Sequence, residues 1–338
     1  NGFYRMDSLT HIALGACAGE LLLGKKLGRP ALLWGAIAQS FPDVDFLAAT
    51  WMSPADNLLA HRGFTHSLLL LTPILAILAA RWHRSHNISS KEWLRFFALG
   101  LMLHIFIDAF NVYGTAWFEP FSDYRVTFNT LYVADIFFSV APGIAVLAMF
   151  FLKKKDKYRR ASAVIGLTVP ALYLMLGIVN KLAVDADIRR MAAVQEISYK
   201  RYFITPTPLN NFLWYVVLEN DSGYNIAYRS VFDEETTIDF QFFPRNQHLL
   251  SAVKNQPDLP QLLRFSQGFY TAEYWHDTLV FNDLRFGQMI GWSDPHARFV
   301  FHYYLQHSAE NKLVMQRGRF ENWSWAALKA LAVRIKGI

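Results

Sequence analysis

The sequence predicts an α-helical membrane bundle of about six apolar helices, some of them short, followed by a soluble α+β domain. Hydrophobic residues make up 53% of the 338 residues and the mean hydropathy is +0.15, both high for a soluble enzyme. The long apolar runs end near residue 180, and short aromatic and β-branched runs follow. We therefore predict a membrane-embedded domain over residues 6–181 and an extracytoplasmic α+β domain over residues 182–338.

Six apolar runs define the predicted bundle, at residues 9–24, 30–42, 67–80, 94–114, 131–152 and 161–180. The last three reach the roughly 20 residues that span a bilayer, whereas the first three are shorter than the usual minimum of about 17. We expect the short runs to be tightly packed or re-entrant helices. The first run does not have the pattern of a cleaved secretory signal, so insertion is expected through the transmembrane segments themselves.

Charge in the connecting loops predicts the orientation. Three alternate loops contain 13 Lys and Arg residues, whereas the remaining segments contain Arg5, Arg62 and Arg125. The positive-inside rule places the rich loops in the cytoplasm and both termini outside. Because the net charge of +6 is explained by these loops, a nucleic-acid partner is disfavoured. A single cysteine excludes an intrachain disulfide and a cysteine-rich zinc site.

The C-terminal part changes character. We expect an amphipathic helix over residues 182–198, then a break at Thr205-Pro206-Thr207-Pro208. Further on, strands are predicted at Phe212–Leu218, Thr237–Phe243, 277–286 and 297–305, and a final helix at 322–336. These elements together are typical of an α+β domain.

Candidate metal ligands collect in the first 135 residues: His11, Asp43, Asp45, His61, His66, His104, Asp108 and Asp135. Ionisable groups in apolar segments are costly, and those that persist usually pair, line a polar cavity or bind an ion. His104 and Asp108 have the i, i+4 spacing that places both on one helical face. The predicted topology puts all eight candidates near the outer membrane face.

Other roles remain open for several candidates. His104 and Asp108 could form a structural hydrogen bond, Asp43 could cap a helix, and Asp45 could be a solvated loop charge. Asp135 could cap the fifth helix near its N-terminus. Two carboxylates at Asp43 and Asp45 would nevertheless repel each other unless a cation or hydrogen-bond donors compensate.

Histidine and carboxylate ligands without thiolate suit zinc, manganese or iron. Zinc is the default expectation, with one to three ions bound. Such a metal would lower the pKa of a water to generate hydroxide, and a second ion could stabilise the leaving oxygen of a phosphoester. Arg62 and Arg125 could neutralise phosphate or anchor at lipid headgroups.

Four sequence blocks carry a family resemblance: Met6-Asp7-Ser8-Leu9-Thr10-His11, Pro42-Asp43-Val44-Asp45, His61-Arg62-Gly63-Phe64-Thr65-His66-Ser67 and His104 to Asp108. In order, they resemble the membrane-bound metal-dependent hydrolase family of LexA-regulated, YdjM-like inner-membrane proteins. That family is similar to zinc-dependent phospholipase C and related nucleases, which bind metal through His and Asp and cleave phosphoesters. The resemblance implies metal ligation by His11, Asp43, His61, His104 and Asp108, and next by Asp45, His66 and Asp135.

We therefore expect a metal-dependent hydrolase that acts on a phospholipid or another phosphorylated substrate. Asp45 or Asp135 would be the general base if it is not itself a ligand. One alternative is a non-catalytic membrane protein with a structural metal and a partner-binding outer domain. Another is a transporter that uses the His and Asp residues as a relay.

Overall fold

The computed structural model describes residues 3–82, 88–133, 135–154, 156–253, 256–305 and 323–338. Arg84 and Lys155, two residues of the positively charged loops, lie outside these ranges. The chain divides into two compact units. Unit 1 comprises Asn1–Thr50 and Ala60–Leu176, and unit 2 comprises Trp51–Leu59 and Gly177–Ile338.

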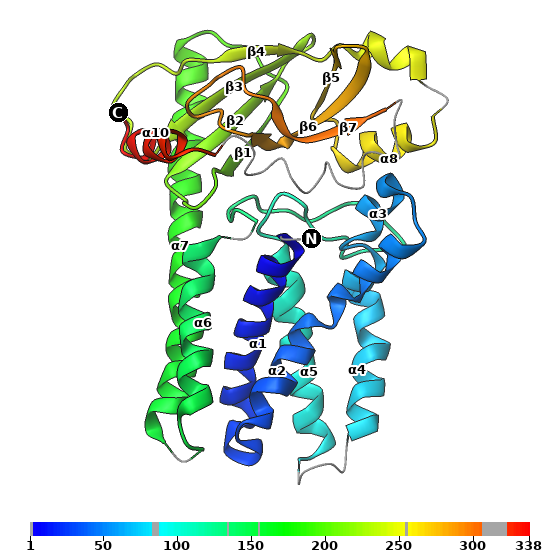
Figure 1. Ribbon diagram of the computed structural model, residues 1–338, viewed down its shortest axis with the longest axis vertical. Helices are drawn as coiled ribbons and strands as arrows, with labels where there is room; N and C mark the ends of the chain where they lie inside the picture. The colour runs from blue at the N-terminus through cyan, green and yellow to red at the C-terminus, as the bar shows by residue number, and fades with distance from the viewer. Residues whose placement is uncertain (1–2, 83–87, 134, 155, 254–255, 306–322) are drawn as a thin grey trace. The chain divides into compact units, whose positions relative to one another are not determined.

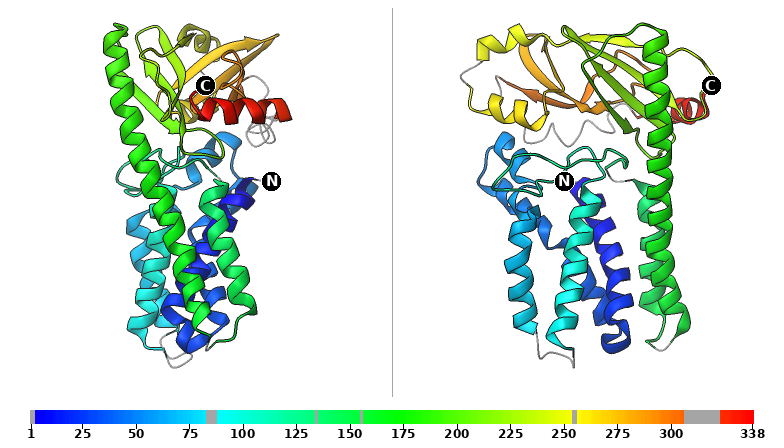
Figure 2. Two further views of the ribbon diagram at one scale, coloured as in Figure 1. Left: turned by 90° about the vertical axis from the view of Figure 1, so that its left-hand side faces the viewer. Right: turned by 180° about the vertical axis from the view of Figure 1, so that it is seen from behind.

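Each of the six apolar runs forms a helix in unit 1 (Figures 1 and 2). These helices are α1 (Phe3–Leu27), α2 (Pro30–Ser40), α4 (Leu68–Trp82), α5 (Ser90–Asp108), α6 (Ile136–Phe151) and the first part of α7 (Lys157–Val194). The residues before and within the first turn of α5 explain where it begins. Ser89 and Glu92 form a reciprocal capping box at its start, and Gly114, with a φ of +63°, lies in the turns beyond its end.

Glycines allow α1 and α2 to approach closely. A Cβ atom at Gly35 would lie 2.0 Å from the carbonyl oxygen of Gly15, and one at Gly19 would lie 2.1 Å from that of Ala31. Gly15 and Gly19 have the small-xxx-small spacing that brings helix backbones together in membranes. The contact between α1 and α2 therefore requires glycine at these positions.

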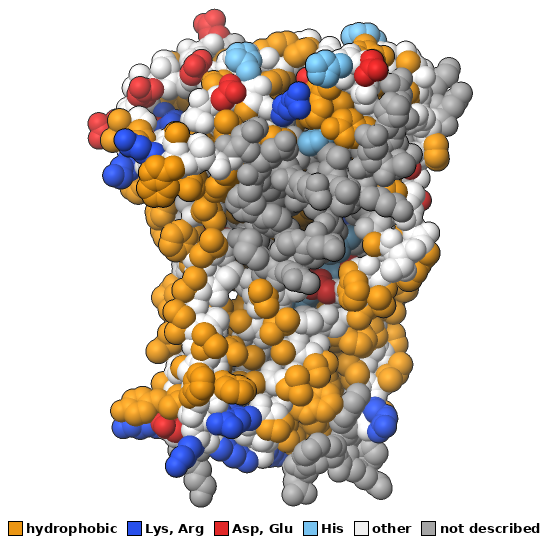
Figure 3. Space-filling view, viewed as in Figure 1, with side chains coloured by type: hydrophobic (Ala, Val, Ile, Leu, Met, Phe, Trp, Pro, Cys, Tyr) orange, Lys and Arg blue, Asp and Glu red, His pale blue; other side chains and the backbone are white. Residues whose placement is uncertain are grey.

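Among the described residues, one helix is long and apolar enough to cross a membrane, namely α7, with 38 residues. The 16-residue helix α6 is apolar but shorter. Hydrophobic side chains cover much of the outer surface of the unit 1 helices (Figure 3). The helical N-terminal region is thus confirmed, whereas six membrane-spanning helices remain a prediction.

Helix α7 differs from the sequence-based expectation. A separate amphipathic helix was expected from residue 182, but α7 continues without interruption to Val194. Neither proline nor glycine occurs between residues 178 and 194, so nothing in the sequence ends the helix there. In its last turns Val184, Ile188 and Met191 are buried against a sheet of unit 2.

Unit 2 contains two antiparallel sheets, as the predicted α+β domain requires. The first has the order β1 (Arg201–Pro206), β2 (Leu213–Glu219), β3 (Gly223–Ser230) and β4 (Gln241–Pro244); the second has β5 (Tyr270–Trp275), β6 (Thr278–Gln288) and β7 (Phe299–Tyr304). The chain also forms α3 (Pro54–Ala60), α8 (Asp258–Phe265) and α10 (Trp325–Ile335).

Candidate metal centre

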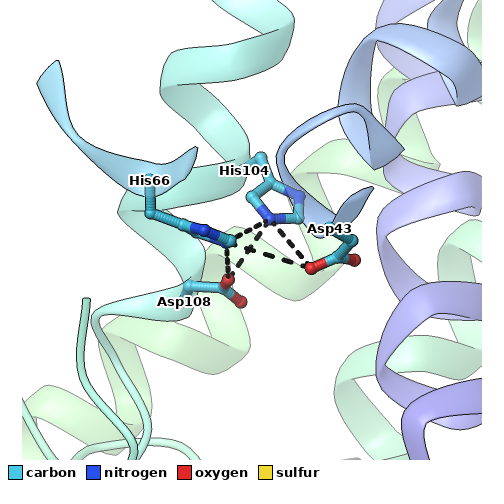
Figure 4. A group of neighbouring side chains, drawn as sticks. All are labelled: Asp43, His66, His104 and Asp108. Carbon is cyan, nitrogen blue, oxygen red and sulfur yellow. Dashed lines mark hydrogen bonds and ion pairs between the residues drawn. The ribbon is translucent and has the colours of Figure 1, made fainter. Parts of the chain in front are cut away.

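Four side chains of unit 1 converge on one point: Asp43, His66, His104 and Asp108 (Figure 4). Asp43 lies in the 3₁₀ segment η1 (Pro42–Thr50), which follows α2. His66 ends the short 3₁₀ turn η2 (Phe64–His66) just before α4. His104 and Asp108 occupy successive turns on one face of α5. Three separate segments therefore supply the four side chains.

The ligand-type atoms of this group are closely spaced. The Nε2 atoms of His66 and His104 are 3.1 Å apart, and each lies 3.2 Å from Asp108 Oδ2. Asp43 Oδ1 lies 3.5 Å from His104 Nε2 and 3.9 Å from His66 Nε2. All four atoms lie within 4.8 Å of one another. Ligands about 2.0–2.1 Å from a tetrahedral zinc would be roughly 3.3 Å apart, so the separations among His66, His104 and Asp108 fit a shared ion, with Asp43 slightly further away.

A buried oxygen supports the same interpretation. Asp108 Oδ2 is inaccessible and makes no hydrogen bond, although two imidazole nitrogens lie 3.2 Å away. Buried carboxylate oxygens ordinarily accept hydrogen bonds, because desolvation without a partner is costly. Atoms that face a common point rather than one another are expected when a cation completes the group. Two nitrogens and two oxygens suit a borderline divalent metal such as zinc.

Exposure differs among the four residues. The side chains of His66, His104 and Asp108 are at most 1% exposed, whereas that of Asp43 is 22% exposed. Asp43 is therefore the member of the group that is in contact with solvent.

A second layer of side chains holds Asp108. Its Oδ1 atom lies 3.0 Å from His11 Nε2 and 3.1 Å from Arg62 Nη2. Arg62 Nη1 also donates to Asn111 Oδ1 at 2.7 Å, and the Arg62 side chain is only 2% exposed. Arg62 thus neutralises Asp108 from behind, while Oδ2 faces the group.

Asp45 holds the other side of the group. Its Oδ2 accepts hydrogen bonds from Arg62 N at 2.7 Å and Thr65 Oγ1 at 3.3 Å, and Thr65 Oγ1 lies 3.0 Å from His66 Nδ1. His61 Nδ1 lies 3.4 Å from Asp45 Oδ1. Burial opposes ionisation of Asp45, but the hydrogen bond and charge of His61, the charge of His66 and the Arg62 amide together hold the pKa of Asp45 below its usual value.

The remaining candidates lie elsewhere. Asp135 caps α6 by accepting hydrogen bonds from the backbone amides of Phe137 and Phe138, and it also accepts one from the Tyr173 hydroxyl. Arg125 donates to the carbonyl oxygen of His61 at 2.8 Å and so supports the loop before η2.

The structure therefore brings four of the six predicted ligands together and places His11 and His61 one layer outside them. Sequence reasoning missed Gln39, which lies 3.3 Å from His11 Nδ1, and Thr65. A buried glutamine within an apolar run was a usable signal for the first. Thr65 had no signal beyond its place between two histidines.

A helical unit with a His and Asp group at the ends of apolar helices defines a membrane protein with a candidate metal centre. The sequence profile of the YdjM inner membrane protein family matches residues 6–184, which include every candidate ligand. The chain belongs to this family.

Two curated relatives extend the comparison. The chain is 37% identical over 123 residues to "Inner membrane protein YbcI" of Escherichia coli (strain K12), which covers 35% of this chain and 69% of YbcI. It is 29% identical over 182 residues to "Uncharacterized protein YfhP" of Bacillus subtilis (strain 168), which covers 51% of each chain. The chain thus spans about half the length of YfhP. No solved structure matches the chain.

Proposed function

We propose that this inner membrane protein is a metal-dependent hydrolase that cleaves a phosphoester, such as that of a phospholipid. The observation that carries the proposal is the convergence of Asp43, His66, His104 and Asp108, with three buried ligands and one partly exposed. A fully enclosed group would suit a structural ion, whereas hydrolysis needs one side open to water and substrate.

The residues have distinct roles in this proposal. His66, His104 and Asp108 would bind the ion from the buried side, and Asp43 would bind it from the more exposed side. When bound, a divalent ion, with zinc proposed first, polarises the phosphoryl oxygen and promotes ionisation of water. Asp45 orients His66 through Thr65, and Arg62 and His11 fix Asp108. The general base would be Asp45, because Asp135 is committed to the cap of α6.

Metal analysis combined with turnover tests the proposal. Detergent-purified protein is expected to contain stoichiometric zinc and to hydrolyse at least one member of a phospholipid and phosphoester panel. His104→Ala should lose both metal and turnover. His302→Ala is the matched control, because His302 is a buried histidine of unit 2 whose Nδ1 lies near a backbone carbonyl. Full turnover by a metal-free His104→Ala variant would refute the proposed metal-dependent hydrolysis.

A structural metal is the main rival, and the burial of three of the four ligands favours it. It predicts metal retention without turnover on any member of the panel, together with unfolding of the helices when the metal is removed. A proton relay predicts the reverse pattern: no bound metal, and pH-driven flux in proteoliposomes.

The orientation is also part of the proposal. We place the candidate metal centre and unit 2 outside the cytoplasm, because the Lys- and Arg-rich loops lie at the other ends of the helices. Protease digestion of unit 2 in intact spheroplasts, but not in sealed inverted vesicles, is the expected result.

A further inference from the structure

Helix α10 (the red helix in Figure 1) presents an outward face that is unusual for a soluble domain. The exposed positions of α10 and of its C-cap are Trp325, Ala326, Lys329, Ala332, Val333 and Lys336. At 100° per residue these six positions fall within about one third of the helix circumference. Four of the six are apolar, the other two are lysines, and the helix contains no acidic residue. Trp325 is 82% exposed.

The opposite face anchors α10 firmly in unit 2. Leu331 packs with Leu213 and Trp292, and Trp292 Nε1 donates to Ala327 O at 3.0 Å. The side chain of Arg334 pairs with Asp233. The outward face is therefore held in a fixed position and is not the surface of a loose tail.

Contacts within unit 2 place α10 at the end of the sheet where α7 leaves the membrane. The apolar part of α7 covers residues 161–180, and 20 helical residues span about 30 Å, the thickness of a bilayer core. Asn180, at the end of this stretch, donates to the carbonyl oxygen of Asn211 at 2.9 Å. Two residues further on, Leu213 begins β2 and contacts Leu331 of α10. The segment 211–213 thus contacts both α10 and the end of the apolar part of α7.

A second exposed aromatic lies at this end of the sheet. Phe232 follows β3, is 54% exposed and stacks on Phe212 with a centroid distance of 5.5 Å. Gly337, which follows α10, approaches the carbonyl oxygen of Phe232 so closely that an added Cβ would lie 2.5 Å from it. Phe232 and the end of α10 are therefore neighbours. The same loop continues with two exposed acidic residues, Glu234 and Glu235.

We propose that Trp325, Lys329, Val333, Lys336 and Phe232 form a membrane-docking surface, here named the α10 surface. Its partner is the anionic lipid surface of the bilayer that α7 crosses. Tryptophan and phenylalanine enter the boundary between headgroups and acyl chains, and lysines attract anionic headgroups. This role is independent of the proposed hydrolase activity, because it requires neither a metal nor a substrate.

Site-directed fluorescence of the full chain tests the proposal. The single cysteine is first removed by Cys17→Ala. In this background Val333→Cys is introduced and labelled with an environment-sensitive fluorophore. Asp221→Cys is the matched control, because Asp221 is exposed in the turn between β2 and β3 at the opposite end of the same sheet. Both proteins are reconstituted in vesicles of phosphatidylethanolamine and phosphatidylglycerol with brominated acyl chains.

The label at position 333 should shift to shorter wavelength and be quenched at least about twofold more than the label at position 221. Adding Lys329→Gln and Lys336→Gln should reduce quenching in anionic vesicles to the level found in phosphatidylcholine. Equal quenching at the two labelled positions would overturn the proposal. A wavelength shift without lipid quenching would also overturn it, since a second copy or another protein would then cover α10. Quenching unaffected by the lysine substitutions would overturn the assignment of anionic lipid.

Discussion

Asp45→Asn tests whether the second layer of side chains tunes a metal centre. The substitution keeps the size of the side chain but removes its charge and one acceptor oxygen. In the protein, Asp45 Oδ2 accepts from Thr65 Oγ1, which contacts His66 Nδ1, so the carboxylate fixes which nitrogen of His66 faces the group. Loss of such a partner typically weakens metal affinity by about 10–100-fold, or roughly 1.4–2.7 kcal/mol.

Competition with a chromogenic chelator measures this change as a zinc dissociation constant of the detergent-solubilised protein. Asp135→Asn is the control, because Asp135 is a buried aspartate of unit 1 that caps α6 and is not one of the four converging residues. It should leave the zinc affinity unchanged and change stability little, because asparagine caps a helix about as well as aspartate. A change below about threefold for Asp45→Asn, or equal losses for both variants, would refute the role assigned to Asp45.

Four further predictions concern stability. Chelation of bound metal should lower the melting temperature of the helical region, and added zinc should restore it; an unchanged melting temperature would contradict a bound ion. Glu20→Ala should destabilise the helices by about 3–5 kcal/mol in thermal unfolding, because the buried guanidinium of Arg159, 2.7 Å from Glu20, would lose its counter-charge. Gly35→Ala should cost about 1–3 kcal/mol by overpacking against α1, whereas Gly143→Ala, with open space around it, should be neutral. Burial raises the pKa of Tyr224 to about 12, whereas the phenol of the unfolded chain ionises near pH 10. The neutral phenol therefore contributes its full stabilisation below pH 10, and this stabilisation is lost between about pH 10 and 12. A free energy of unfolding, measured by circular dichroism, that does not change over this pH range would contradict the prediction.

Hydropathy predicted which segments are helical but not where each helix ends. The run at 94–114 became α5, which ends at Asp108 although apolar residues continue, and the chain then turns, with Gly114 at a φ of +63°. The run at 131–152 became α6, which begins only after Asp135, because that side chain caps the helix. Both limits depend on polar side chains and backbone geometry, which an apolar average does not register.

Strands were predicted less completely than helices. The runs that gave β2, β6 and β7 are rich in aromatic and β-branched residues, and the run at Thr237–Phe243 gave only the short strand β4. Strands β1, β3 and β5 were not predicted. Strand β1 ends in Pro206, and β3 begins with a glycine and contains an asparagine. Neither strand has strong local β propensity, so both depend on pairing with neighbouring strands.

The candidate site could be predicted as a set of residues but not as an arrangement. Spacing on one helix placed His104 beside Asp108. Which of His61 and His66 faces them depends on the turn at Gly63, and the resemblance favoured His61. In the structure His66 joins the group and His61 contacts Asp45 instead. Five-residue spacing across a turn does not determine which of two imidazoles points inward.

Charge balance links the two layers of the centre. Asp43, Asp45 and Asp108 contribute three negative charges close together, and the guanidinium of Arg62 contacts Asp108 and contributes one positive charge. With the imidazoles of His66 and His104 neutral, as metal ligands must be, the three carboxylates and the Arg62 guanidinium sum to a charge of −2 in a largely buried site. Isolated buried charge is costly, and a divalent cation is the simplest group that cancels it. The outer carboxylate of Asp45 and the cation of Arg62 are therefore parts of one electrostatic unit with the four converging side chains.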